Sequence, residues 1–226
     1  MLALCVFAFA QEPQGAKEAK VSPTPEPVAA PAVAAAAAGP ISAGIVVDNS
    51  GSFRLVLEFV IKTTQGVAKV VETNDEGFLV RFIDKDKIEI LQELTGDKDL
   101  LLSATDDMYV EGGLTAISEA LMFSAKHLIE KGKNDRKMII LITDGDNRSD
   151  KKFHADTLKF LKDNNISVYI VGITTVLDGN LREAQKFLEK LASETGGALV
   201  NVDRKMSPDD AAGALVKAVR ANSNGK

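Results

Sequence analysis

Hydrophobic residues after Pro40 occur in two patterns, short uninterrupted runs and longer stretches with helical spacing. Short apolar runs are typical of strands buried on both faces, whereas apolar residues at steps of three and four are typical of amphipathic helices. The runs predict strands over residues 41–47, 77–84, 87–94, 138–143, 166–173 and 198–202. The helical spacing predicts helices over residues 53–71, 97–107, 114–131, 153–164, 181–194 and 207–221.

The alternation of these elements predicts an α/β fold with a doubly wound, mostly parallel sheet of six strands and helices on both faces. The strand at 87–94 alternates Ile88 and Ile90 with charged residues, so we expect it at an edge of the sheet. In such sheets, ligands bind outside the carboxyl ends of the strands, where the strand order reverses. We therefore expect functional residues in the turns that follow strands.

The segment before the first strand differs in composition from the rest. Residues 1–10, MLALCVFAFA, are apolar and end in Ala8-Phe9-Ala10, which is typical of the h-region and cleavage site of a secretory signal, although no Lys or Arg precedes the run. A frayed apolar terminus is the alternative, since spanning a bilayer takes about 20 apolar residues. Residues 11–40 are rich in Pro and Ala, as in a semi-extended linker. We expect an exported, periplasmic or extracellular protein with one folded domain over residues 41–222.

Charge and cysteine content exclude several classes of function. The formal net charge is −5, and 27 basic residues are interleaved with 32 acidic ones, so we expect no nucleic-acid partner and no anionic membrane surface as partner. Cys5 is the one cysteine and precedes the folded part, which therefore has neither a disulfide nor a thiolate metal site.

Oxygen-bearing side chains follow two of the predicted strands and begin one predicted helix. Asp48-Asn49-Ser50-Gly51-Ser52 comes after the first strand, and Thr143-Asp144-Gly145 ends the strand at 138–143. Gly112-Gly113-Leu114-Thr115 lies at the start of the helix predicted from residue 114. Because these positions share the carboxyl edge of the sheet, we expect five side chains to meet there: Asp48, Ser50, Ser52, Thr115 and Asp144.

These five side chains supply two carboxylates and three hydroxyls. Hard oxygen donors suit Mg²⁺, with Mn²⁺ and Ca²⁺ as alternatives, rather than zinc. In an extended stretch the side chains of residues 48, 50 and 52 project to one side, while Asn49 and Gly51 face away. Five such donors leave the shell of the ion incomplete, so we expect it to keep water or to accept an external carboxylate.

The pattern Asp-x-Ser-x-Ser, then Thr, then Asp resembles the metal-ion-dependent adhesion site (MIDAS) of von Willebrand factor A (VWA) domains, and all five positions match in order. The resemblance covers residues 41–222 and looks closest to secreted bacterial VWFA-related proteins, which also carry a signal and a low-complexity lead. It implies a strand order of 3-2-1-4-5-6 with the third strand antiparallel. It also implies that Ser50, Ser52 and Thr115 bind the ion directly or nearly so, and that Asp48 and Asp144 often act through water.

The function implied by the resemblance is a non-catalytic, cation-dependent module for cell adhesion or other protein binding, which binds a Glu or Asp carboxylate of a partner protein and needs no small-molecule cofactor. Loops around Asn49, 112–114 and 146–150 would contact the partner, and Asp146 and Asp150 would serve either as solvated loop residues or as a rim that tunes specificity. A charge-removing substitution is expected to leave the fold largely intact, because the site is taken as a surface feature.

The same residues leave two alternatives to a protein-binding site, a metal-dependent hydrolase and a purely structural ion. A hydrolase that uses the same ion to activate water is the rival, although no general acid or base is evident near the site. A purely structural ion is the third alternative, and Asp48 with its serines, taken alone, is equally typical of a strand-to-helix turn and cap. Neither a nucleophile elbow around Ser50 nor a Walker sequence is present, and His127 and His154 lack a second ligand at metal spacing.

Overall fold

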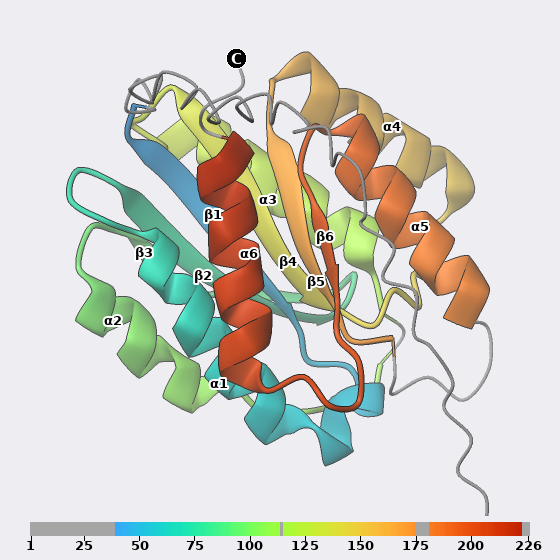
Figure 1. The fold of residues 1–226 in the computed structure, drawn as a ribbon. Coiled ribbons are helices and arrows are strands. Elements are labelled where there is room, and N and C mark those ends of the chain that lie inside the picture. Colours follow the sequence, from blue (N-terminus) through green and yellow to red (C-terminus); the bar gives the residue numbers. More distant parts are fainter. Residues whose placement is uncertain (1–38, 114, 175–180, 223–226) are drawn as a thin grey trace, which may run out of the picture. The chain divides into compact units, whose positions relative to one another are not determined.

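Six strands form one sheet in the order β3-β2-β1-β4-β5-β6 in the computed structural model, which describes residues 39–113, 115–174 and 181–222 (Figure 1). The strands are β1 (Ile41–Asp48), β2 (Glu76–Asp84), β3 (Lys87–Thr95), β4 (Arg136–Thr143), β5 (Ser167–Gly172) and β6 (Leu199–Asn201). β3 pairs antiparallel with β2, and the remaining pairs are parallel. The predicted fold class and strand order are confirmed.

Helices cover both faces of the sheet (Figure 1). They are α1 (Leu57–Val67), α2 (Lys98–Ser103), α3 (Ile117–Lys131), α4 (Lys151–Asp163), α5 (Leu181–Glu194) and α6 (Pro208–Asn222), with 3-10 turns η1 (Gly51–Leu55), η2 (Ala68–Val70) and η3 (Ala104–Asp107). Alternate residues of β1 enter different cores, because successive side chains of a strand point to opposite faces. Ile45 and Val47 pack with α1 and α6, whereas Val46 packs with α3, α4 and α5.

The position of the candidate site follows from the arrangement of the two central strands, β1 and β4. β1 pairs with both β2 and β4, so the chain winds outward in one direction from β1 and in the other direction from β4. Their carboxyl ends lie side by side, because Val47 of β1 is level with Ile142 of β4. Ligand sites in doubly wound sheets lie at such a reversal of strand order.

Three predicted helices differ from their observed forms, and the one predicted over 97–107 consists of α2 and η3. The helix predicted over 53–71 is three pieces, η1, α1 and η2. The helix predicted from residue 114 begins at Ile117, so Thr115 precedes the helix instead of starting it. Ala116 has φ −114° and ψ 68°, which is not a helical conformation. Ile129, placed by its spacing in the buried stripe of this helix, is 43% exposed because Leu128 occupies the core position.

The proposed signal run and nearly all of the proposed linker lie outside the described residues, as does Leu114. Within the described part, no helix has both the length and the apolar character needed to cross a bilayer.

Candidate metal centre

Two carboxylates lie buried at the adjoining ends of β1 and β4. Asp48 is the last residue of β1 and Asp144 directly follows β4, and both are 0% exposed. One oxygen of Asp48 accepts a hydrogen bond from the Thr143 hydroxyl at 2.7 Å, and the other accepts one from the Ser50 backbone N–H at 3.0 Å. Asp144 accepts from the Asp146 backbone N–H at 2.9 Å through Oδ1. Its Oδ2 is buried and has no hydrogen-bond partner among the described residues.

The electrostatics of this pair favour a positive charge between the carboxylates. Burial and the neighbouring Asp144 carboxylate raise the pKa of Asp48 to about 7, against the opposing hydrogen bonds from Ser50 and Thr143. Burial also raises the pKa of Asp144, and the nearby Ser52 hydroxyl opposes this rise. A buried carboxylate with an unpartnered oxygen costs stability unless a donor or a cation satisfies it. These two carboxylates are therefore arranged as a cation would require.

The two serines are held together by the turn that leaves β1. Ser50 is extended, with φ −65° and ψ 167°, and Ser52 lies in η1. Their hydroxyl oxygens are 3.2 Å apart. The stretch is therefore not extended as far as Ser52, contrary to the sequence-based geometry, yet the 3-10 turn still brings both hydroxyls to one point. Ser50 is buried, whereas Ser52 is exposed and faces solvent.

The loop that carries Thr115 is fixed to the other two pieces by hydrogen bonds. The Thr115 carbonyl accepts from the Arg148 backbone N–H at 2.8 Å, in the loop that follows Asp144. The first amides of α3 are satisfied by that same loop, because the Ile117 N–H donates to Asn147 and the Ser118 N–H to Ser149. The structure thus brings Asp48, Ser50, Ser52 and Asp144 together and sets Thr115 in a loop alongside them. That all five bind an ion stays a prediction.

Several sequence-based roles around the site change in the structure. Asn49 does not face a partner, because its side chain is 0% exposed and donates to the Tyr109 carbonyl at 2.7 Å. Asp150 is the N-cap of α4 and accepts from the Lys152 and Phe153 backbone N–H groups, so its role is explained without a partner. The site is not a surface feature, since both of its carboxylates are fully buried.

The remaining titratable groups near the site have structural partners. Asp146 is half-buried and pairs with Arg148 at 2.7 Å, which agrees with a position on the rim. His154 contacts the buried Ser118 hydroxyl at 3.1 Å, and burial lowers its pKa. Within the described residues, no three His, Cys, Asp or Glu side chains are grouped so that they could hold a metal ion. An ion at this site would therefore depend on the hydroxyls as well as on the two carboxylates.

Sequence reasoning overlooked two residues that shape the site. The Thr143 hydroxyl binds Asp48, and its place directly before Asp144 at a strand end was the available signal. Arg81 lies in the middle of an apolar strand, between the fully buried Val80 and Phe82, and is itself 7% exposed. A charged residue at a buried strand position indicates a specific partner.

Comparisons with known proteins agree with this geometry. The sequence model of the von Willebrand factor type A domain matches residues 44–211. Human Vitrin is 28% identical over 156 residues, which is 66% of this chain and 21% of Vitrin, so the chain spans about a fifth of that protein. A von Willebrand factor type A structure from Catenulispora acidiphila superposes with a TM-score of 0.66 at 20% identity, covering 83% of this chain and 43% of that chain.

A second solved structure is a surface adhesin. The pilus adhesin SpaC from Lactobacillus rhamnosus GG, in its open conformation, has a TM-score of 0.65 at 15% identity, covering 81% of this chain and 30% of that chain. At these identities the solved structures show the fold. VWA domains are in general non-enzymatic modules for protein interaction and adhesion. The match of the family over residues 44–211 shows that this chain belongs to the von Willebrand factor type A domain family.

Proposed function

We propose that this domain binds one divalent cation, with Mg²⁺ as the expected ion, and uses it to bind a Glu or Asp carboxylate of a partner protein. The residues that would hold the ion are Asp48, Ser50, Ser52, Thr115 and Asp144. The observation that carries the proposal is the pair of buried carboxylates at adjoining strand ends, one of which has an unpartnered oxygen. Hydrogen bonds within the described residues do not satisfy that oxygen, whereas a dication would.

The donor set fits a hard dication whose shell remains open. Two carboxylates balance the charge of the ion, and the three hydroxyls add neutral oxygens without filling a flexible or octahedral shell. A bound ion of this kind supplies a positive charge that attracts an anionic group. A carboxylate is an oxygen ligand with a negative charge, and so it suits the open position.

The exposed side of the turn after β1 would contact the partner. Ser52 is exposed, and so is Arg54, two residues further along η1. Leu55 is 94% exposed, the highest value among the large hydrophobic side chains of the described residues. An acidic partner would be attracted by Arg54, and an apolar side chain next to its carboxylate would pack against Leu55.

A hydrolase that uses the same ion is the second candidate, and the structure adds no support to it. A general base must lie within hydrogen-bond reach of the water that it deprotonates. The histidine packed beside the loop after β4, His154, is directed at the buried Ser118 hydroxyl instead. Incubation of the full chain with generic phosphoesters and carboxylic esters, with Mg²⁺ and with EDTA, separates the two candidates, because turnover that needs the ion would support a hydrolase.

The binding test uses the full chain and an Asp144→Asn variant as its matched control. Envelope proteins of a bacterial host are passed over each immobilised protein in Mg²⁺, and the column is then eluted with EDTA. We expect specific partners on the wild type alone, eluting with EDTA, and we expect their loss when the carboxyl groups of the extract are amidated beforehand. Equal capture by the variant, or capture that persists in EDTA, would contradict the proposal.

The location follows as part of the same proposal. The apolar run at residues 1–10 resembles the core of a secretory signal, and the similar structures include a bacterial pilus adhesin. We therefore infer export, with the domain held on a linker outside the cytoplasm. Fractionation of cells that express the tagged full chain tests this location.

A further inference from the structure

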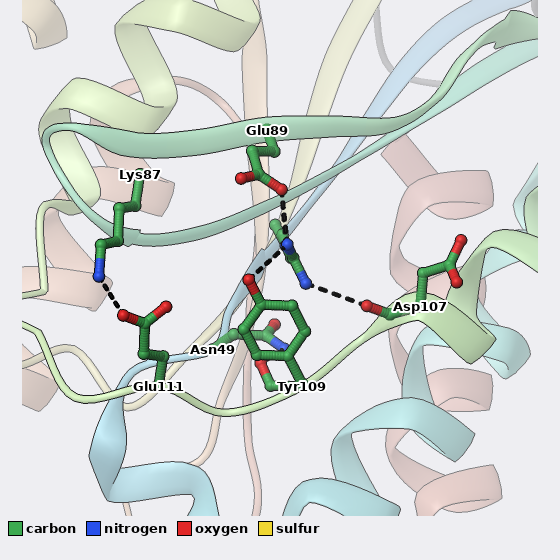
Figure 2. A network of polar contacts seen from close by, with 7 residues as sticks. Asn49, Lys87, Glu89, Asp107, Tyr109 and Glu111 are labelled. Carbon is green, nitrogen blue, oxygen red and sulfur yellow. Dashed lines mark hydrogen bonds and ion pairs between the residues drawn. The ribbon is translucent and has the colours of Figure 1, made fainter.

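A buried arginine beside the site holds the loop that leads to Thr115. Arg81 lies on β2 and is 7% exposed, in a strand whose other side chains are almost all buried. Burial of a guanidinium is costly unless its donors are satisfied. Arg81 meets this condition through Glu89, which accepts from its Nε at 3.1 Å and from its Nη2 at 2.6 Å (Figure 2).

The guanidinium also contacts residues 107–113, the segment that begins at the last residue of η3, which we call the crossing loop. Nη1 of Arg81 donates to the Asp107 carbonyl at 3.0 Å, and Nη2 donates to the Tyr109 hydroxyl at 2.8 Å (Figure 2). The Arg81 Cζ also lies 3.7 Å from the centroid of the Tyr109 ring. One side chain thus fixes the crossing loop at a backbone carbonyl, a hydroxyl and a ring.

The crossing loop in turn holds the turn that contains the site. The Tyr109 carbonyl accepts from the Asn49 side-chain amide at 2.7 Å, and the Glu111 backbone N–H donates to the Asn49 carbonyl at 3.2 Å. Asn49 is fully buried between Asp48 and Ser50. Figure 2 shows Asn49 and Tyr109 beside each other, with Glu89 on the neighbouring hairpin. Hydrogen bonds therefore connect Arg81 to the Asp48–Ser50 turn by way of Tyr109 and Glu111.

The end of the crossing loop is confined as well. A side-chain carbon added to Gly113 would lie 2.5 Å from Ile83 and 3.1 Å from Asp84, so the loop runs closely over the end of β2. Gly112 lies against Gly51, since a side-chain carbon added to Gly51 would be 3.8 Å from the Gly112 Cα. Thr115 follows this confined path by two residues.

We propose that Arg81 is a positioning residue for the cation site, which holds the crossing loop so that Thr115 and the Asp48–Ser52 turn stand ready for the ion. The inference rests on the proposed cation binding. A planar guanidinium is suited to this task, because it can bind a carboxylate, a carbonyl and a hydroxyl at once in fixed directions. A lysine ammonium at the same place would keep the charge and lose that geometry.

A second arginine offers a matched control at the opposite end of the sheet. Arg220 donates to the Val70 carbonyl at 2.6 Å and pairs with Glu72 at 2.9 Å, so it also joins a carboxylate to a backbone carbonyl. It is remote from the site in the fold, because Val70 lies in the connection that enters the amino end of β2. Loss of either arginine breaks a link between a carboxylate and a backbone carbonyl, yet only the link made by Arg81 leads to the site.

The experiment measures Mn²⁺ and Mg²⁺ affinity of the full chain by calorimetry, and its melting temperature in chelator. We expect Arg81→Gln to weaken cation binding by about 10- to 100-fold, the usual cost of losing a residue that orients metal ligands. Arg81→Lys should recover little of this loss. Arg220→Gln should lower the melting temperature by a comparable amount and leave the cation affinity within about twofold.

Tyr109→Phe provides a milder variant if Arg81→Gln does not fold, because it removes one hydroxyl and keeps the ring. We expect it to weaken cation binding by about 3- to 10-fold, in line with the net contribution of one typical hydrogen bond. Wild-type affinity in Arg81→Gln, or in Tyr109→Phe where the first is unfolded, overturns the positioning role alone. A wild type that binds neither ion overturns the proposed function, and the inference with it.

Discussion

The two ends of the central strands both bury carboxylates, and they differ in how fully the carboxylate oxygens are satisfied. At the amino end, Asp75 accepts from the Ile41 backbone N–H at 2.8 Å and from the Glu72 backbone N–H at 2.9 Å, one donor for each oxygen. Glu76 accepts from the Ser42 hydroxyl at 2.7 Å and from the Lys133 backbone N–H at 2.6 Å. Arg220 adds a positive charge 3.7 Å from Asp75.

At the carboxyl end, no positive side chain is paired with Asp48 or Asp144 in the described structure, and burial raises the pKa of both carboxyl groups, with the Asp144 carboxylate adding to the rise at Asp48. Buried carboxylates whose oxygens accept hydrogen bonds link neighbouring elements and stabilise the fold. At the carboxyl end, Asp144 Oδ2 has no donor among the described residues, and buried polar atoms of this kind are found where a ligand completes them. The difference favours the carboxyl end as the place where the proposed cation binds, without reference to any sequence motif.

The largest expected effect is the loss of cation binding in Asp144→Asn. Removal of one of two carboxylates should weaken Mg²⁺ and Mn²⁺ binding by at least about 100-fold, because charge dominates the affinity of oxygen sites. In chelator the same variant should melt at or above the wild-type temperature, since it relieves repulsion between buried charges. Calorimetry and thermal melting measure the two effects. Cation affinity within about threefold of wild type would remove Asp144 from the site.

An Asp→Asn substitution at the amino end should lower stability and leave cation binding unchanged, the reverse of Asp144→Asn. Asp75→Asn places an amide where both oxygens now accept backbone N–H groups, so we expect a loss of about 1–3 kcal/mol in the free energy of unfolding. Cation affinity should not change. Urea unfolding in chelator measures the first quantity and calorimetry the second, and a stable Asp75→Asn that has lost the cation would reverse the assignment of the two ends.

The pH dependence of stability in chelator should report on Asp48. Burial and the Asp144 carboxylate raise the pKa of Asp48 in the folded protein to about 7, from an ordinary value of 3.8, so the folded state holds the extra proton between these values. The free energy of unfolding should therefore fall as pH rises from about 4 to about 7, by up to about 4 kcal/mol from this one group, and then level off. Melting in EDTA across this range, compared with Asp48→Asn, isolates the effect. An identical pH profile in both proteins would show that Asp48 does not titrate in this way.

The smallest effect is expected at the rim of the carboxyl end. Leu55→Ser should weaken capture of the EDTA-eluted partners by about 3- to 10-fold, because the partner would bury part of an exposed leucine. Cation affinity and melting temperature should stay at wild-type values. Ile129→Ser, at an exposed position of α3 beyond the site, is the control and should capture partners normally. If Leu55→Ser and Ile129→Ser changed partner capture equally, the turn after β1 would not be the partner-binding surface.

Much of the fold could be predicted from the spacing of apolar residues. The helix at 181–194 has the predicted bounds, and the runs around 41–47 and 138–143 are the two central strands. These elements are strongly periodic or uniformly apolar, so local composition decides them. The boundaries near Thr115 could not be predicted in the same way, because the first amides of α3 are satisfied by side chains of the distant loop at Asn147 and Ser149.

The candidate site, like the fold, could be predicted from the sequence only in part. Asp48, Ser50, Ser52 and Asp144 could be named from the sequence because they follow strands in the positions where an α/β sheet binds ligands. Their burial could not be predicted from the sequence, and neither could the supporting contacts of Asn49 and Arg81. Those contacts join residues far apart in the chain, and a sequence does not state which donor reaches which acceptor.

The sequence by itself determined which segments are strands and helices and which oxygen-bearing residues stand at strand ends, since both follow from the order of side chains along the chain. The tertiary structure alone decided which buried carboxylates are satisfied. Asp75 and Asp144 are the same residue type in similarly buried places, yet one has a donor for each oxygen and the other has a free oxygen. That outcome depends on the packing of remote segments, because desolvation and hydrogen bonding act through space and not along the sequence.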